Sequence, residues 1–570
     1  MVRKLALPSV WHRVGPPRVT VVAIGALLIA LISGCGSSSG SASGASSANA
    51  AATAAGLPPV HLVNVTPPAK GDVASVTWDI PLGEPLSLDP VKVWDPASQT
   101  VLPNICEALL RVEPNLQVGP SLATSIRAES ASRYVFTIRQ GVKFWDGHPM
   151  TMADVLYSLR SQLSPSSFYA VFTSLIKSIT QTGPWQITVT TKVPFVYYQK
   201  LMAMGLGTIY EKAYAQRAGA AYGTPSGGVM CTGPFKLKSW QPGQQITLVR
   251  NPLYWDKPHA AKASTFIFKF ITNPATVVDG LASGELDGSY ELPPRSIPVL
   301  QASGAGHVYF GPSLIMNVLQ AVATKGPVAN PLIRQAIALA IDRQGLANAT
   351  FNGYAAPARW PFPPWYGYAQ STFRAAYNSL PNDSRPNLTA ARALVKRAGT
   401  PTSAISLAAL SGSDASVGIA TEAASAMTAI GLNAKVDVLQ PAAYTNIYFS
   451  AKARQGIGFV VGTGGGTFED FPDPVEILFL EGETTSPYNL DHYSNPQLDS
   501  LVTRAMATLN PATRATLVTK AALAYTHGEA MIPLVSAPES VFLNNRITGA
   551  PTPYSVWNLY PWAAAIGSTS

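Results

Sequence analysis

Alternation of apolar and polar residues predicts several β-strands in the chain after residue 74. Tyr134, Phe136 and Ile138 occupy every second position of one segment, as expected for a strand with one buried face. Segments 185–191 and 244–251 show the same period and predict two further strands.

Apolar residues at three- and four-residue steps predict helices between and after these strands. One helix is expected after Thr151, because Asp154 follows three residues later in a capping-box-like arrangement with Asp in place of Glu or Gln. Its predicted apolar face comprises Val155, Leu156, Leu159 and Leu163. Further helices are expected from Pro331, over residues 498–505 and after Asn510. Mixed strands and helices predict an α/β or α+β protein with more than one lobe.

The first 34 residues have the pattern of an export signal. Basic residues without acidic ones precede an apolar run over 19–32, which is shorter than the roughly 20 apolar residues that a membrane-spanning helix needs. Small residues follow this run, as expected for a cleaved signal peptide over 1–34.

Residues 31–35, Leu-Ile-Ser-Gly-Cys, resemble the lipobox of bacterial lipoproteins. This resemblance implies cleavage before Cys35 and lipid attachment to its thiol; the alternative is an ordinary signal peptide with an incidental cysteine. Residues 36–56 are almost all Gly, Ser and Ala, so we expect a flexible tether over 35–70. The expected location is extracytoplasmic, with a lipid anchor in the cytoplasmic membrane.

Composition indicates a globular protein, because 47% of residues are hydrophobic and only 12% are charged. The 536 residues after the predicted signal exceed the usual size of one domain. The formal charge is +9, but four of the 40 basic residues lie in the signal and the others form no basic run. Nucleic-acid binding is therefore not expected.

Cysteine and histidine spacing predicts no metal site. Besides Cys35, the chain has only Cys106 and Cys231. In an oxidising compartment these two thiols could form a disulfide, and the alternative is two buried free thiols.

Sequence blocks in order along most of the chain resemble the family 5 extracellular solute-binding proteins, the peptide-binding lipoproteins of ABC importers. The most specific block is YVFTIRQGVKFWDGHPMTMADVLYSL at 134–159. Other matching blocks lie at 85–90, 104–125, 231–240, 248–256, 333–346, 352–364 and 530–549. Cys106 replaces the usual aromatic residue, and Cys231 replaces the first Gly of a Gly-Thr-Gly-Pro block.

The resemblance implies a two-lobed, periplasmic-binding-protein-like fold with a hinge, of the large type with an extra subdomain. Lobe one is expected at 71–312 and 533–570, and lobe two at 313–532. The crossover strands are expected near 313–317 and 531–536. Both Cys106 and Cys231 would then lie in lobe one.

The resemblance also indicates ligand-binding residues. Residues 468–474 resemble a block in which the first Asp binds the α-ammonium of a peptide, and Asp470 occupies that position. The alternative is a loop Asp that caps a turn. Its neighbours Glu469, Phe471 and Thr467 are further candidates, although Thr467 stands where the family has Trp. Possible aromatic ligand contacts, which could equally be core residues, are Trp94, Trp145, Trp360 and Trp365.

These expectations describe the substrate-binding lipoprotein of an ABC transporter, which captures an oligopeptide or peptide-like solute and delivers it to a membrane permease. Alternatives are an oligosaccharide or metal-complex binder of the same fold, or a regulatory or scaffolding lipoprotein that has lost transport. The only Gly-x-Ser-x-Gly sequence lies in the tether at 36–40, and His-Glu-x-x-His is absent. Neither catalysis nor a cofactor is therefore expected.

Overall fold

The computed structural model of the chain describes residues 58–80, 83–93, 95–363, 368–462, 473–553 and 560–570. The predicted signal peptide, Cys35 and most of the predicted tether lie outside these residues. Within them, no helix combines the length and the apolar character needed to cross a membrane.

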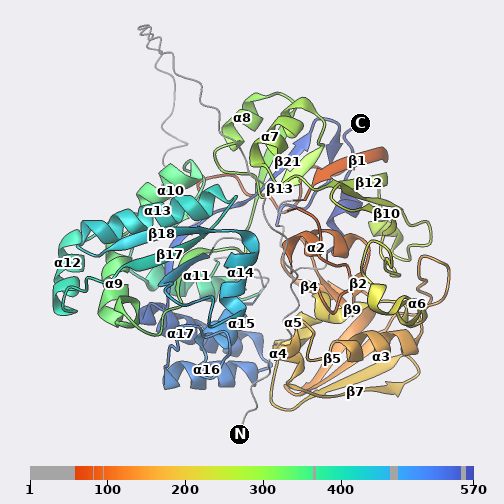
Figure 1. Cartoon of the computed structure of the whole chain (residues 1–570). Coiled ribbons are helices and arrows are strands. Elements are labelled where there is room, and N and C mark those ends of the chain that lie inside the picture. Colours follow the sequence, from red (N-terminus) through yellow and green to blue (C-terminus); the bar gives the residue numbers. More distant parts are fainter. Residues whose placement is uncertain (1–57, 81–82, 94, 364–367, 463–472, 554–559) are drawn as a thin grey trace, which may run out of the picture. The chain divides into compact units, whose positions relative to one another are not determined.

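A seven-stranded sheet is the largest in the described chain (Figure 1). Its strand order is β10 (Phe235–Gln241), β11 (Gln245–Arg250), β12 (Ala263–Lys269), β1 (Val73–Asp79), β13 (Gly288–Tyr290), β21 (Glu539–Asn544) and β14 (Gly306–Gly311). The central strand β1 is parallel to both of its neighbours, and the other pairs are antiparallel.

A second sheet has six strands and a similar mixture of directions. Its order is β16 (Ala356–Pro357), β20 (Met531–Ser536), β15 (Asn317–Ala321), β19 (Phe459–Gly462), β17 (Ile405–Leu410) and β18 (Ala434–Leu439). Strand β17 is parallel to β18 and β19, and the remaining pairs are antiparallel.

A third, antiparallel sheet follows the order β5 (Ala123–Ser130), β6 (Arg133–Ile138), β8 (Gln186–Thr191) and β7 (Ile176–Gly183). Short two-stranded ladders join β2 (Glu107–Ala108) to β9 (Thr208–Ile209), β3 (Leu110–Val112) to β4 (Val118–Pro120), and β22 (Ile547–Thr548) to β23 (Gly567–Ser568).

Helices alternate with these strands. Those up to residue 302 are α2 (Pro96–Val101), α3 (Met152–Ser161), α4 (Ala170–Thr173), α5 (Tyr198–Leu201), α6 (Lys212–Ala218), α7 (Pro274–Ser283) and α8 (Ile297–Ala302). Those after it are α9 (Pro331–Ala340), α10 (Arg343–Phe351), α11 (Gln370–Ser379), α12 (Leu388–Arg397), α13 (Asp414–Ala429), α14 (Pro441–Phe449), α15 (Val475–Ile477), α16 (Pro496–Met506) and α17 (Pro511–Gly528). A π-helical turn, Leu478–Gly482, follows α15.

The chain passes between the two large sheets twice. Strand β14 ends at Gly311 in the seven-stranded sheet, and β15 begins at Asn317 in the six-stranded one. The return is shorter, because β20 ends at Ser536 and β21 begins at Glu539. This is the predicted two-lobed, mixed α/β fold. The predicted lobe boundary at 532/533 falls inside β20, and the boundaries stay a prediction.

The predicted helix starts are confirmed by their caps. The Thr151 hydroxyl accepts the Asp154 N–H, and the Asp154 carboxylate accepts the Thr151 N–H at 2.9 Å, which completes the capping box before α3. Asn330 and Asn510 cap α9 and α17. The prediction for Leu163 was wrong, because α3 ends at Ser161 and the Leu163 side chain is 40% exposed.

The cysteines in two of the family-like blocks are bonded to one another. A disulfide joins Cys106 to Cys231, which are 125 residues apart in the sequence. Beside it, the buried Glu107 carboxylate accepts hydrogen bonds from the Thr232 hydroxyl at 2.6 Å and the Tyr254 hydroxyl at 3.0 Å. It also accepts the indole N–H of Trp255 at 2.9 Å. Covalent and polar contacts therefore fix these distant segments together.

Candidate functional site

A cavity of about 610 Å³ lies at the two connections between the large sheets. Its lining includes Ser313 and Ile315 from the first connection and Pro538 from the second. Residues at the carboxyl ends of strands from both sheets complete it, among them Asp79 at the end of β1 and Leu410 at the end of β17. We call this cavity the crossover pocket.

The crossover pocket has a mixed lining. Its apolar part includes Ile271, Val277, Leu292, Phe310, Ile315 and Phe351. Neutral polar groups come from Ser289, Ser313, Ser411, Ser413, Asn317 and Gln440. A concave surface with polar groups among apolar ones is typical of small-molecule sites.

Asp79 is the most deeply buried acid of the pocket lining, with 2% of its surface exposed. Its Oδ1 atom is itself buried and has no hydrogen-bond partner among the described residues. Burial raises the pKa of Asp79 to about 7, and the Ile271 backbone N–H opposes this shift only in part. Asp79 is therefore a buried acid in the wall of the cavity, with a pKa near neutrality.

Glu291 and Glu539 bring two more carboxyl groups to the pocket, from neighbouring strand ends. Glu291 has a backbone φ of 52°, in the left-handed region that residues other than glycine rarely adopt. Its N–H donates to Glu539 Oε1 at 3.2 Å, and the same oxygen accepts the Ser540 N–H at 2.9 Å. Burial raises the pKa of Glu291 to about 7. A costly backbone conformation thus places a carboxyl group at the cavity.

Tyr290, also in the lining, is held by aromatic packing. Its ring centroid lies 5.3 Å from that of Trp78 and 5.1 Å from that of Trp562. Its hydroxyl donates to the Pro551 carbonyl at 2.7 Å. This side of the pocket is therefore anchored in the core of the seven-stranded sheet.

Most of the ligand-binding residues proposed from the sequence lie outside the described part of the chain: Asp470, Glu469, Phe471, Thr467, Trp94 and Trp365. Trp145 and Trp360 are described, and both are buried, at 8% and 1% exposed. Trp360 packs against Phe362 and Tyr377. Neither tryptophan is part of the crossover pocket lining, and their contact with a ligand stays a prediction.

Sequence reasoning missed the role of Asp473, the second Asp of the 468–474 block. Asp473 is 1% exposed, and its Oδ2 lies 3.1 Å from Lys200 Nζ and 3.4 Å from a terminal guanidinium nitrogen of Arg514. The Tyr368 hydroxyl donates to its Oδ1 at 3.1 Å. Burial by itself would raise the pKa of Asp473, but the two cations outweigh it and lower that pKa. This ion cluster joins α5 to α17.

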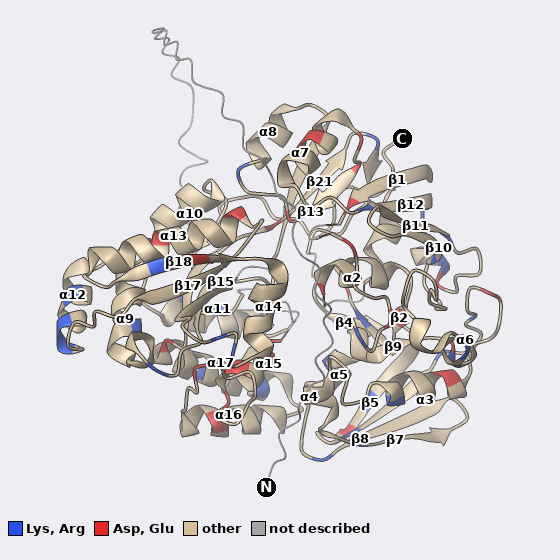
Figure 2. Ribbon diagram, viewed as in Figure 1, with Lys and Arg blue, Asp and Glu red and all other residues tan. Residues whose placement is uncertain are grey.

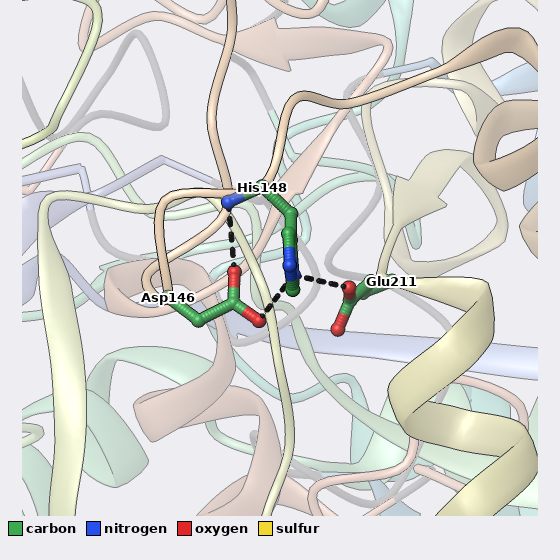
Figure 3. Close-up of side chains that lie close together, drawn as sticks. All are labelled: Asp146, His148 and Glu211. Atoms are coloured by element: carbon green, nitrogen blue, oxygen red, sulfur yellow. Dashed lines mark hydrogen bonds and ion pairs between the residues drawn. The ribbon is translucent and has the colours of Figure 1, made fainter.

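A second charged group lies near the surface, at the Phe-Trp-Asp-Gly-His turn (Figure 3). His148 Nδ1 is 2.9 Å from Asp146 Oδ2 and 3.2 Å from Glu211 Oε1. The hydrogen bond to Asp146 is the main reason that the pKa of His148 is raised. An imidazolium between two carboxylates accounts for this arrangement, and none of the three residues lines the crossover pocket.

Comparison with known proteins relates this architecture to one family. Residues 117–485 match the profile of the bacterial extracellular solute-binding proteins, family 5, middle region. The glutathione-binding protein GsiB of Salmonella typhi is 28% identical over 319 residues, which are 55% of this chain and 60% of that protein. The matched part is thus less than two thirds of that relative.

Solved structures show the same fold over nearly the whole described chain. DppA from Helicobacter pylori, an ABC transporter-associated periplasmic binding protein in complex with the peptide STSA, has a TM-score of 0.75 at 21% identity. That match covers 88% of this chain and 99% of DppA. The PBP AgaA from A. tumefaciens R10, in complex with agropinic acid, has a TM-score of 0.73 at 22% identity, covering 87% of this chain and 98% of AgaA.

Proposed function

This chain belongs to the bacterial extracellular solute-binding proteins of family 5, and from that premise we propose that it is the substrate-binding lipoprotein of an ABC transporter. It captures an oligopeptide or peptide-like solute outside the cytoplasmic membrane and delivers it to a permease. The matched relatives are binding proteins, and the proposal includes no catalytic step.

The crossover pocket is the observation that carries this proposal. One cavity is lined by Asp79 and Ser289 of the seven-stranded sheet and by Leu410 at the end of a strand of the six-stranded one. A solute in it contacts both lobes at once. Such a ligand binds the closed arrangement more tightly than an open one, and this difference in affinity is what shifts the population towards closure.

The ligands of two relatives support a peptide-like solute. GsiB is a glutathione-binding protein, and DppA was solved with the peptide STSA. The crossover pocket, at about 610 Å³, falls within the roughly 300–1,000 Å³ of small-molecule sites. A short peptide or a molecule of similar size is therefore the proposed class of solute.

A ligand copurification experiment tests the proposal. The mature protein with Cys35→Ala would be purified without denaturation and its bound solutes identified by mass spectrometry, followed by calorimetry with the recovered compound. Ser411→Trp, which places an indole in the pocket, should weaken binding about tenfold or more, since it removes contact area and volume. Ser174→Trp, at an exposed position away from the pocket, is the matched control.

The results separate the alternatives. Recovery of a peptide or peptide-like compound whose affinity falls in Ser411→Trp supports the proposal, and Asp470→Asn then tests whether Asp470 binds its ammonium group. Undiminished affinity in Ser411→Trp would exclude the crossover pocket as the site. A protein that neither carries nor binds any solute would contradict the transport function.

The lipid anchor is a separate part of the proposal. A lipid anchor and a flexible tether would keep the binding protein close to its permease, and this raises its effective concentration there. Mass spectrometry of the amino-terminal peptide should find diacylglycerol on Cys35, and Cys35→Ala should abolish this form. A mature protein that begins elsewhere and carries no lipid would contradict the anchor.

A further inference from the structure

Three side chains of metal-ligand type converge at the Phe-Trp-Asp-Gly-His turn, outside the crossover pocket lining (Figure 3). His148 Nδ1 lies 2.9 Å from Asp146 Oδ2 and 3.2 Å from Glu211 Oε1, and one donor atom of each residue lies within 4.8 Å of the others. Ligand atoms that surround one Zn²⁺ ion at about 2.0–2.2 Å are about 2.9–3.5 Å apart. Both distances from His148 match this spacing. Cysteine and histidine spacing did not reveal the group, because Glu211 lies far from the other two residues in the sequence.

The two segments that carry these side chains are attached to the same piece of backbone. The Trp145 N–H donates to the Cys231 carbonyl at 3.2 Å, and the Glu211 N–H donates to the Met230 carbonyl at 3.0 Å. Residues 230 and 231 are consecutive, and Cys231 is held by its disulfide to Cys106. The turn and Glu211 therefore keep their positions relative to one another without a bound ion.

The turn also orients the Asp146 carboxylate. The His148 N–H donates to Asp146 Oδ1 at 3.1 Å, which leaves Oδ2 facing the imidazole. Gly147 between them has a φ of 95°, in the region that favours glycine, and this brings both neighbouring side chains to one side. Metal-binding carboxylates are commonly oriented by a hydrogen bond of this kind.

Glu211 is the independent sign that a cation belongs here. It is 5% exposed, and in the described chain its carboxyl group is partnered only by His148, whose side chain is 68% exposed. Oε1 faces His148, and Oε2 of the same carboxyl group has no hydrogen-bond partner among the described residues. A buried carboxylate is costly unless a positive charge or several hydrogen-bond donors accompany it. An ion at Oε1 supplies that charge.

No other cation takes this place in the part of the chain that the structure describes. Neither Asp146 nor Glu211 forms an ion pair with a Lys or Arg there. Arg217 acts on Glu211 at longer range, but its guanidinium lies over the Tyr214 ring, 5.6 Å from the ring centre. Figure 2 shows acidic and basic residues spread over many elements, without one large region of either sign. Attraction of a cation therefore depends on these particular side chains.

We propose that Asp146, His148 and Glu211 bind one divalent transition-metal ion, such as Zn²⁺. One imidazole nitrogen with two carboxylate oxygens suits this class, whereas Ca²⁺ and Mg²⁺ prefer sites built from oxygen alone. Asp146 and His148 are exposed, so water can complete the coordination on the outer side. The ion takes the place of the proton that His148 otherwise holds between the carboxylates, and that proton passes to water. It joins the turn to the residue that precedes α6.

Calorimetry with Zn²⁺ tests the inference. The mature protein with Cys35→Ala, which also lacks a free thiol, would be purified without a histidine tag, treated with EDTA and titrated with ZnCl2, CaCl2 or MgCl2. One Zn²⁺ ion should bind per chain, and Ca²⁺ and Mg²⁺ should bind at least about tenfold more weakly. The melting temperature should rise with Zn²⁺, because the site exists only in the folded chain.

Two substitutions locate the site. His148→Ala and Glu211→Gln should each weaken Zn²⁺ binding by about tenfold or more and reduce the rise in melting temperature. The matched control is His259→Ala. His259 Nδ1 lies 2.9 Å from the single carboxylate of Asp256, which Arg111 already pairs, so this variant should bind Zn²⁺ as the parent does. Circular dichroism checks that each variant is folded.

The outcomes decide between a metal ion and a shared proton. One Zn²⁺ ion per chain, with affinity lost in His148→Ala and kept in His259→Ala, supports the site. Absence of saturable Zn²⁺ binding, or equal affinity in the parent and in folded His148→Ala, would overturn it and leave the proton as the only occupant. The inference does not depend on the proposed function, and its failure would leave peptide capture intact.

Discussion

At the residue scale, Asp473 is the charge on which the contact between α5 and α17 depends. Lys200 and Arg514 both lie against its carboxylate, and all three side chains are largely removed from water. Removing one charge of a buried ion cluster leaves the opposite charges buried without a partner. This destabilises the folded state more than replacing the whole cluster with apolar residues would.

Asp473→Asn should therefore lower the free energy of unfolding at pH 7 by about 3 kcal/mol, measured by urea denaturation. Asp72→Asn removes an exposed ion pair with Arg250 and should cost less than about 1 kcal/mol, which makes it the control. Equal losses in the two variants would show that the Asp473 cluster contributes no more than a surface pair.

The loss of stability caused by Asp473→Asn should depend on pH. Burial would raise the pKa of Asp473, but Lys200 and Arg514 outweigh it, so its pKa is lower in the folded than in the unfolded chain. Its stabilisation is present above the ordinary carboxyl pKa of about 4 and is lost as the pH falls through the folded value. The difference between wild type and Asp473→Asn should shrink in acid.

At the element scale, the Cys106–Cys231 disulfide and the Glu107 hydrogen bonds hold two distant segments together. The bond closes a loop of 125 residues, and loops of this length correspond to about 4–5 kcal/mol in the chain-entropy description. The polar contacts of Glu107 with Thr232 and Tyr254 remain when the bond is absent.

Cys106→Ser combined with Cys231→Ser should fold but lose about 2–5 kcal/mol of stability, measured by guanidinium denaturation. Wild-type protein unfolded in the presence of a thiol reductant should show the same loss. An unchanged denaturation midpoint in the double variant would mean that the bond adds nothing beyond the Glu107 contacts.

Capping residues that are close together in the sequence made the starts of helices predictable. The start of α3 requires only Thr151 and Asp154, and the starts of α9 and α17 require an Asn followed by Pro. The same reasoning extended the apolar stripe to Leu163, because periodicity does not reveal where a helix ends. The ion pair between Asp473 and Lys200 could not be predicted from local sequence. Lys200 lies 273 positions earlier in the chain, and no motif near either residue indicates the pairing.

At the scale of the whole molecule, resemblance rather than periodicity predicted the two lobes. The sequence blocks implied crossover strands, and the sheets show that the chain passes between them after β14 and after β20. The crossover pocket was not predicted, because its lining comes from many segments between Asp79 and Ser540. The sequence-based candidates around Asp470 lie outside the described residues and stay predictions.

The buried acids of the crossover pocket have a consequence for the conditions outside the cell. Burial raises the pKa values of Asp79 and Glu291 to about 7, so a fall from neutral to mildly acidic pH adds protons to the pocket wall. An exported protein meets the acidity of its surroundings directly. The affinity for a bound solute, measured by calorimetry at about pH 6 and about pH 8, should therefore differ between the two conditions while the fold stays intact.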